Sequence, residues 1–462
     1  MKVIKTDIIP QKQTFVKIKN RTHTFDYKAI CIFSALGFFL DDDTYWLDTK
    51  VLKPATINKI DKDGFLVSSE KWFNWHYTPR DISLDKTVLE FTEIFEKNIK
   101  NQTKGKKVIL PLSGGLDSRT QAVALSKIKA DVNSYSYSFE NGFKEAEISK
   151  KIANKLNFPF QDFKIKKGYL WSKIEDLATI NKCYSEFSHP RQMAVIDDVK
   201  KLGDLFSLGH WGDVLFDSEG IDYLDESNIL PILKKKLIKK GGIELAESLW
   251  KDWEMEGVFK DYLNQRLLHL WIDIKIDNFS AKLRAFKSLY WAPRWTSVNL
   301  LIFESARPLS LPYYDNEMCK FICTLPEGLL KGRQIQIEYI KKNSTKVANI
   351  TWQAMKPFNL YNYHLNKFPY NLPYRIISKM KRTLQEVFGE KYIQRNWELQ
   401  FLGEENEEKL KYYLFSNEYN TFISSKRIKL FYNNFKTKNS VTYAHSISTL
   451  LTLSLWFKNH KK

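Results

Sequence analysis

Short apolar runs alternate with helix-forming stretches through the middle of the chain, and this alternation constrains the fold more than any other feature. The order is strand 108–112, helix 119–128, strand 132–139, helix 145–156 and strand 160–165, with a later strand at 205–208. Strands joined by helices of this length are typical of parallel βαβ units, which have right-handed crossovers and helices on both faces. The sequence therefore predicts an α/β fold built on a parallel sheet.

The segments on either side of this alternation have different patterns. Short aromatic and β-branched runs between turn signals predict strands at 14–18, 30–33, 56–60 and 65–67. A helix with apolar residues over 88–99 follows, and we expect Ser83 or Asp85 to cap it. Residues 228–345 and 374–462 are predicted to be mainly helical, ending in a helix at 446–457. We therefore divide the chain into a small β-rich domain, 1–85, and an α/β domain with a helical C-terminal part, 86–462.

Composition limits the class of partner. With 43% hydrophobic and 15% aromatic residues among 462, the chain can bury large cores, which excludes disorder as its main state. Its 72 Lys and Arg exceed its 53 Asp and Glu by 19, a balance that favours nucleic acid, a membrane surface or a polyphosphate. The basic residues are spread along the whole chain, however, and a lysine-rich solvated surface explains their short clusters better.

Four cysteines in so long a chain do not make a disulfide framework. Cys319 and Cys323 lie one helical turn apart without a second pair to complete a zinc site, so we expect core packing for them. The longest apolar stretch, 29–40, is shorter than the roughly 20 residues that cross a bilayer, and the first residues lack a signal-peptide pattern. We expect a cytoplasmic protein without a membrane partner.

The turn between the first strand and helix of the α/β region carries the strongest chemical signal. It reads Leu-Ser-Gly-Gly-Leu-Asp-Ser over 112–118, where parallel sheets bind ligands. The two glycines let backbone N–H groups approach an anion, and the following helix presents its positive end. Ser113 and Ser118 offer hydroxyls to phosphate oxygens, and Asp117 offers a hard oxygen ligand to magnesium. The alternative is an ordinary turn with an Asx cap.

This hexapeptide, 113–118, resembles the pyrophosphate loop of the ATP-pyrophosphatase superfamily, in particular the synthetase domain of class B asparagine synthetases. Relatives of that domain include β-lactam synthetases and lasso-peptide cyclases. The resemblance implies a parallel, five-stranded sheet of the adenine nucleotide α-hydrolase type, with ATP and Mg²⁺ as cofactors. It also implies a pyrophosphate site made of Leu112, Ser113, Gly114, Gly115, Leu116, Asp117, Ser118 and, from a later loop, Gly209.

Three further segments are similar to the same family and occur in the same order. The loop 208–216 (Leu-Gly-His-Trp-Gly-Asp-Val-Leu-Phe) puts Asp213 at the position of a second magnesium ligand. Residues 304–333 resemble the family's Arg…Pro-Phe-Leu-Asp stretch and its Leu-Pro…Lys-x-Gly-Arg continuation. Residues 350–358 resemble a Trp-Arg-x-Lys segment, which would make Lys356 an electrostatic catalyst at the phosphate and the acyl carbon.

The chain also departs from the family pattern. Members that use glutamine begin with a nucleophilic cysteine, whereas Lys2 follows Met1 here, and 1–85 is shorter than a glutaminase domain. Residues 38–54 resemble only the end of that domain. We therefore expect no glutamine hydrolysis, and the nitrogen would come as ammonia, from a separate glutaminase, or as an amine.

The second loop carries His210 and Val214 where the family has glutamates, and Trp211 where it has a small residue. A histidine at this point could serve as a general base near neutral pH. The alternatives are a site adapted to a different substrate and a site that has lost activity, and retention of Asp117, Asp213 and Lys356 argues against complete loss.

The favoured hypothesis is an ATP-dependent ligase that adenylates a carboxylate and transfers it to ammonia or an amine, releasing AMP and pyrophosphate. The second is a tRNA-modifying ATP pyrophosphatase, which the net charge of +19 favours. A third is a catalytically inactive scaffold derived from the fold. Nucleic acid is therefore an expected partner only under the second hypothesis.

Overall fold

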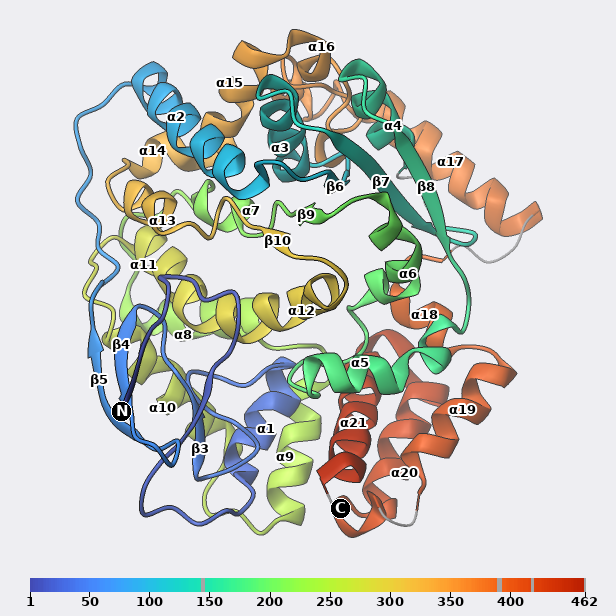
Figure 1. Cartoon of the computed structure of the whole chain (residues 1–462). Helices are drawn as coiled ribbons and strands as arrows, with labels where there is room; N and C mark the ends of the chain where they lie inside the picture. Colours follow the sequence, from blue (N-terminus) through green and yellow to red (C-terminus); the bar gives the residue numbers. More distant parts are fainter. Residues whose placement is uncertain (143–145, 389–392, 417–418, 461–462) are drawn as a thin grey trace.

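The structure, a computed structural model, describes residues 1–142, 146–388, 393–416 and 419–460. Its centre is a five-stranded sheet in the order β10-β9-β6-β7-β8, in which every pair is parallel (Figure 1). The strands are β6 (Val108–Pro111), β7 (Val132–Phe139), β8 (Phe160–Ile165), β9 (Leu205–Ser207) and β10 (Leu309–Ser310). This confirms the predicted α/β class. The sequence missed only β10, because two residues are too few to form a pattern.

Helices cover both faces of this sheet. On one side α2 (Leu84–Thr103), α3 (Leu116–Lys127) and α15 (Gln334–Asn343) pack against one another, and on the other lie α12 (Ser297–Ala306) and α6 (Ile196–Val199) (Figure 1). α4 (Ala146–Lys155) follows β7 as predicted, and residue 145 lies outside the described residues. Helix α2 begins where expected, because the side chain of Ser83 accepts a hydrogen bond from the Lys86 N–H.

The first 71 residues form two small antiparallel sheets and one buried helix. Strands β1 (Lys2–Lys5), β4 (Thr56–Ile60) and β5 (Leu66–Lys71) make one sheet, and β2 (Phe15–Lys17) pairs with β3 (Thr49–Val51). The strand predicted at 30–33 is wrong, since these residues lie in α1 (Tyr27–Leu36). Asp26 caps that helix and Gly37 ends it at φ 81°. All residues from Ala29 to Leu36 are buried, so no polar face marks the helical period.

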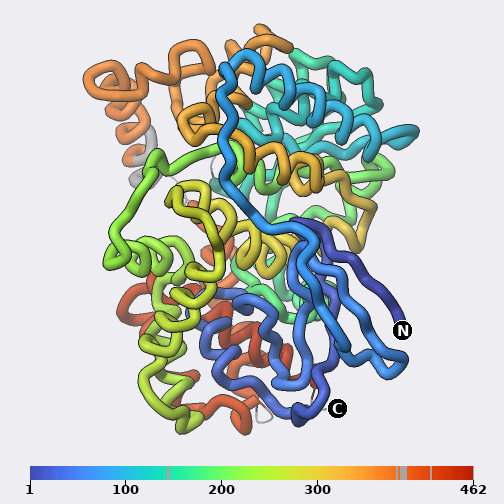
Figure 2. The backbone as a smooth tube through the Cα atoms, turned by 90° about the vertical axis from the view of Figure 1, so that its left-hand side faces the viewer, coloured from blue at the N-terminus to red at the C-terminus, as the bar shows by residue number. Residues whose placement is uncertain are grey.

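The N-terminal region packs into the same buried cluster as the rest of the chain. The ring of Tyr45 stacks on that of Trp456 at 3.9 Å, and α1 packs against α9 (Gly242–Asp252). Figure 2 shows the residues after β5 running as one extended segment from the N-terminal strands to α2. The division at residue 85 stays a prediction about domains; in space the two parts share a core.

Most of the second half is helical, as predicted. The remaining α-helices in the described part of the chain are α5 (Ile174–Asn181), α7 (Gly212–Leu215), α8 (Glu226–Leu237), α10 (Phe259–Ile272), α11 (Phe279–Phe286), α13 (Asn316–Ile322), α14 (Glu327–Leu330), α16 (Thr345–Ala348), α17 (Leu372–Phe388), α18 (Asn396–Phe401), α19 (Glu404–Leu414), α20 (Ser425–Asn433) and α21 (Ser440–His460). Between α11 and α12 the chain forms a π-helix, η4 (Lys287–Thr296), which contains Pro293. Such π-helical segments are frequent at functional sites.

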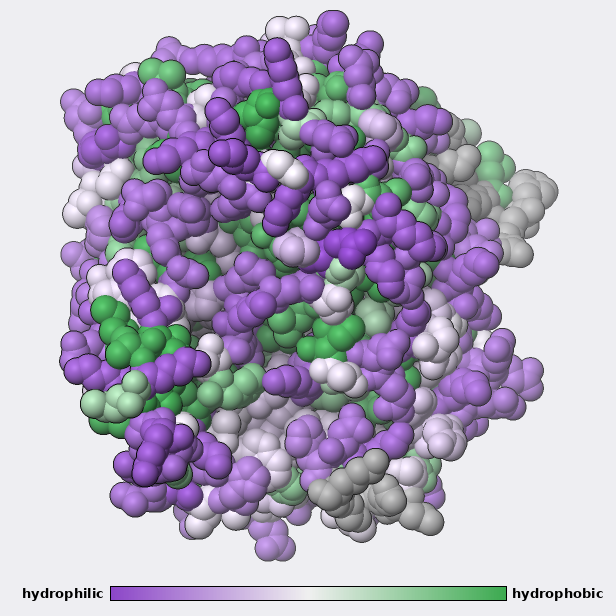
Figure 3. Space-filling view, viewed as in Figure 1, coloured by the Kyte–Doolittle hydropathy of each residue, from purple (hydrophilic) through white to green (hydrophobic). Residues whose placement is uncertain are grey.

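The surface is predominantly hydrophilic. Figure 3 shows polar and charged residues over most of one face, interrupted by smaller hydrophobic patches. All four cysteines are buried and free, as expected for core residues. In the described part of the chain, no helix combines the length and the apolar character needed to cross a bilayer.

Candidate functional site

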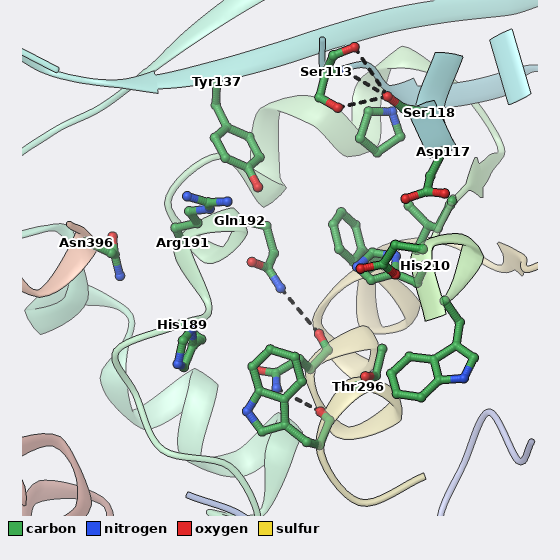
Figure 4. Close-up of a pocket in the computed structure, with 18 of the residues that line it drawn as sticks. Ser113, Asp117, Ser118, Tyr137, His189, Arg191, Gln192, His210, Thr296 and Asn396 are labelled. Atoms are coloured by element: carbon green, nitrogen blue, oxygen red, sulfur yellow. Dashed lines mark hydrogen bonds between the residues drawn. The ribbon is translucent and has the colours of Figure 1, made fainter. Parts of the chain in front are cut away.

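A cavity of ≈ 810 Å³ opens at the carboxyl ends of β6, β7 and β9. Its walls are the turn after β6, the end of β7, the turn 208–214 after β9, residues 188–192, parts of η4 and α12, and residues 394–397 (Figure 4). Parallel sheets bind ligands in this position, and the volume suits a nucleotide together with a second molecule. Ser113, Asp117, Ser118, Gly209, His210 and Asp213 of the predicted site all line this one cavity, as do Leu112 and Val214.

The turn after β6 is closed by its two serines. The Ser113 N–H donates to Ser118 Oγ at 3.0 Å, the two hydroxyl oxygens lie 2.9 Å apart, and the Gly115 N–H donates to Ser113 Oγ at 3.2 Å. Leu116 begins α3 and is buried beneath the turn. Helix α3 therefore presents the positive end of its dipole beside two hydroxyls, an arrangement that suits phosphate.

Gly114 has no room for a side chain. A Cβ there would lie 2.8 Å from Gln353 Cβ and from Gln353 Oε1. The Gly114 N–H donates to Gln353 Oε1 at 3.1 Å, and the Gln353 N–H donates to the Gly114 carbonyl at 3.1 Å. The segment 350–353 is thus joined directly to the turn.

Arg119 fixes that junction from inside the protein. Its fully buried guanidinium donates to the carbonyl oxygens of Ile350 at 2.9 Å, Thr351 at 2.8 Å and Gly114 at 3.2 Å. Sequence analysis did not single out Arg119 and Gln353. An arginine among the apolar residues of a predicted helix is the pattern that could have indicated Arg119. Lys356 follows on the same segment, half-buried, and is not among the residues that line the cavity. Its catalytic role stays a prediction.

Asp117 points into the cavity from the first turn of α3 and carries a paired carboxylate. Arg333 donates to its Oδ1, and Gln336 Nε2 donates to the same oxygen at 3.1 Å. Burial raises the pKa of Asp117 to about 6, Arg333 opposes this rise, and Asp213 adds to it. Gln336 also donates to the Tyr313 hydroxyl at 2.7 Å, so α15 holds the carboxylate in place.

The second loop lies directly on Asp117. A Cβ at Gly209 would lie 3.0 Å from Asp117 Cβ, and one at Gly212 would overlap Asp117 Oδ1. Asp213 opens α7 next to this contact and lines the cavity. The predicted pair of acidic residues is therefore brought together, although 96 residues separate them in the sequence.

His210 and Trp211 occupy different environments in this loop. His210 is exposed to the interior of the cavity, whose walls desolvate the ring and lower its pKa to about 4, with Asp213 partly opposing this effect. The ring is therefore neutral at physiological pH. Trp211 is buried and adopts a left-handed backbone (φ 77°), with its indole N–H donating to Ser288 Oγ at 3.0 Å.

The residues fit magnesium bound together with a nucleotide. Asp117 and Asp213 present hard oxygen ligands beside the phosphate-type turn, and their mutual repulsion favours a cation between them. No group of three or more His, Cys, Asp or Glu side chains that could hold a metal occurs among the described residues. Magnesium often binds through one or two carboxylates and completes its shell with phosphate oxygens and water.

The cavity also contains residues that no sequence motif indicated. Lys287 enters from η4, and His189 and Arg191 enter from the turn before α6. Burial lowers the pKa of the Lys287 ammonium, and nearby Lys236 lowers it further. These residues come from segments without recognisable patterns, so only the folded chain reveals them.

The turn after β6 and the two acidic residues at the carboxyl ends of parallel strands form a site of the kind that binds nucleotide phosphates in α/β folds. Residues 90–194 match the family model "Asparagine synthase", which confirms the predicted resemblance to asparagine synthetase-like proteins over this segment. No curated protein sequence matches the chain. Among solved structures, the U34-tRNA thiolase NcsA from Methanococcus maripaludis, with its [4Fe-4S] cluster, is similar at 13% identity over 50% of this chain and 85% of its own, with a TM-score of 0.23.

Proposed function

We propose that the protein is an ATP-dependent ligase that adenylates a carboxylic acid and transfers the acyl group to ammonia or an amine. The observation that carries this proposal is the contact of the 208–214 loop with Asp117, which places two carboxylates beside the Ser113–Ser118 turn in one cavity of ≈ 810 Å³. That volume leaves space for a second substrate beyond the triphosphate.

The first half-reaction joins a carboxylate oxygen of the acid to the α-phosphorus of ATP and releases pyrophosphate. The turn 113–118 binds the departing pyrophosphate through its hydroxyls, its backbone and the start of α3. Magnesium, held by Asp117 and Asp213, would neutralise charge on the phosphates. Lys287 adds a cation to the wall of the cavity. The family resemblance also implies Lys356 as an electrostatic catalyst, although Lys356 does not line the cavity.

In the second half-reaction the amine nitrogen attacks the acyl carbon, the bond to AMP breaks, and the nitrogen loses a proton. His210 is neutral because its pKa is lowered to about 4, so its ring can accept a proton at physiological pH. The amine would be ammonia, supplied free or by a separate glutaminase, or an amine carried by the second substrate.

Pyrophosphate release from ATP and Mg²⁺, screened over carboxylic acids with ammonium present, tests the proposal. Asp117→Asn should lower the rate by about 100-fold or more, because one metal ligand is lost. The matched control is Asp63→Asn, which changes an exposed residue in the turn between β4 and β5. This variant should keep the wild-type rate. ATP binding without pyrophosphate release for any acid would contradict the proposal and favour an inactive scaffold.

A further inference from the structure

Helix α17 directs apolar side chains away from the protein. Five of its large apolar residues recur at helical spacing, and each is 41–59% exposed: Leu372, Ile376, Ile377, Met380 and Leu384. Tyr374 and Ser378, on the other side of the helix, are half-buried. A surface helix of a globular protein normally has the reverse arrangement, with its apolar face toward the core. The apolar face of α17, defined by these five residues, is therefore available to a partner.

Two exposed aromatic side chains come directly before this face. Phe368 is 76% exposed and Tyr370 is 58% exposed. The Leu372 N–H donates to the Pro369 carbonyl at 3.0 Å, so this short segment is joined to the first turn of the helix. Monomeric soluble proteins rarely expose large contiguous apolar patches, and such patches mark interaction sites. The described residues of 368–384 belong to neither the buried core nor the cavity, so neither explains why they are apolar.

The charge of this part of the chain has one sign. Residues 339–385 contain nine Lys and Arg and no Asp or Glu. On α17, Arg375 and Lys379 are exposed and lie one turn apart. Arg375 comes three residues after Leu372 and Lys379 three residues after Ile376, so both cations flank one border of the apolar face. A partner of this surface should therefore combine negative charge with an apolar layer.

An anionic membrane surface fits these observations better than the alternatives. RNA would bind the cations but would leave Ile376, Ile377 and Met380 in water. A second protein would need an acidic groove shaped to the helix, whereas a lipid surface takes up one apolar face of a helix without such a fit. Lys and Arg then remain at the headgroups, and aromatic side chains favour the same boundary. Figures 1 and 2 show α17 at the periphery of the molecule, where a flat surface can reach it.

We propose that α17 and residues 368–370 bind the surface of an anionic membrane, with the apolar face of α17 entering the boundary between headgroups and acyl chains. The expectation of no membrane partner rested on the longest apolar stretch, 29–40, which is too short to span a bilayer. A helix that lies on the surface requires no such stretch. The inference does not depend on the proposed ligase, since no described residue of 368–384 lines the cavity.

Co-sedimentation of the full chain with phosphatidylcholine vesicles, with and without phosphatidylglycerol, tests the proposal. Binding should require phosphatidylglycerol and weaken as salt is raised. Ile376→Ser combined with Met380→Ser should lower the apparent affinity about tenfold or more, because two apolar side chains no longer enter the lipid boundary. The matched control, Leu89→Ser combined with Ile272→Ser, changes two side chains that are similarly exposed on α2 and α10 and should keep the binding. Circular dichroism checks the folding of both variants.

A fluorescent label shows which surface meets the lipid. All four native cysteines are buried, so a polarity-sensitive dye can be attached selectively to an introduced, exposed cysteine. The dye on Ile377→Cys should shift its emission to the blue when anionic vesicles are added, because this position enters the lipid boundary. The same dye on Val67→Cys in β5, a position of nearly equal exposure, should not shift. Equal shifts at both positions, or none at Ile377→Cys, would contradict the assignment to α17.

The remaining outcomes assign the surface to another partner and overturn the inference. Vesicle binding that the double serine variant does not weaken would be adsorption by charge alone. Self-association that this variant abolishes, without vesicle binding, would assign the apolar face to a second copy of the chain. RNA binding with a steep salt dependence, again without vesicle binding, would assign the cations to nucleic acid. None of these measurements uses ATP, so their results are independent of whether the ligase is confirmed.

Discussion

Arg333 donates a hydrogen bond to the carboxylate of Asp117 across 216 residues of sequence. Arg333 stands just before α15, and Gln336 one turn later binds the same oxygen. The residue expected to hold magnesium is therefore already paired with a cation of the protein. The pair keeps a negative charge in a buried position where burial alone would favour the protonated acid.

Arg333→Gln should shift the acidic limb of the pH profile of pyrophosphate release to higher pH. Arg333 opposes the rise of the Asp117 pKa, so its removal moves this pKa above about 6 and delays formation of the metal-binding carboxylate. The measurement is kcat/KM between pH 5 and 9. Arg333→Lys retains the charge and should keep most of the wild-type limb, and an unshifted limb in Arg333→Gln would contradict the prediction.

Asp117→Asn should increase the free energy of unfolding at pH 7.5 by about 1–3 kcal/mol. The folded-state pKa of Asp117 is raised from 3.8 to about 6, so ionisation of this group destabilises the fold increasingly as pH rises from about 4 to 6. Below about pH 3 the acid is protonated in both states, so the gain should fall to nearly zero. Urea unfolding of both proteins at about pH 2.8 and 7.5 checks this, and a gain of the same size at both pH values would be inconsistent with it.

Gly212→Ala should lower the rate of pyrophosphate release by about 100-fold or more, because its methyl group must displace Asp117 Oδ1. The matched control is Gly328→Ala in α14, where an added Cβ has no atom within 4 Å. Steady-state kinetics on both variants, with circular dichroism to check folding, distinguish a local displacement from loss of structure. Similar rates for the two variants would argue against the close contact.

Arg119→Met should destabilise the protein by about 2–4 kcal/mol, because the carbonyl oxygens of Ile350 and Thr351 lose the guanidinium donor and the Gly114 carbonyl keeps only the Gln353 N–H. It should also weaken ATP binding, since the segment 350–353 then no longer supports the turn at Gly114. Arg80→Met, which removes an exposed pair with Glu90, should cost less than about 1 kcal/mol and leave ATP binding unchanged. Chemical unfolding and ATP titration together test both parts.

His210→Ala should slow amide formation more than adenylate formation. The pKa of His210 is lowered to about 4, so the ring is neutral throughout the physiological range and its own titration should not shape the profile between pH 6 and 8. Rapid-quench measurements can follow pyrophosphate and amide separately. Equal losses in the two half-reactions would exclude the general-base role.

Much of the central fold was readable from local pattern. Strands β7 and β8 have the predicted bounds, and residues 112–115 form a turn between β6 and α3, as expected, although α3 begins at Leu116 and not at 119. These elements are short-range, since apolar runs, glycines and helix caps act within a few residues. The pattern failed at 30–33, because every residue of α1 from Ala29 to Leu36 is buried and composition alone resembles a strand.

The α/β class, the turn after β6 and the acidic residues Asp117 and Asp213 could thus be predicted from the sequence itself, because local patterns and a family motif indicate them. Tertiary structure decided which side chains share the cavity, and it left Lys356 outside the cavity wall. It also brought Arg333 to Asp117, Gln353 to Gly114, and His189 to Trp295. Each of these contacts joins segments more than 100 residues apart. Such contacts depend on how helices pack around the sheet, and packing of distant segments leaves no periodic mark in the sequence.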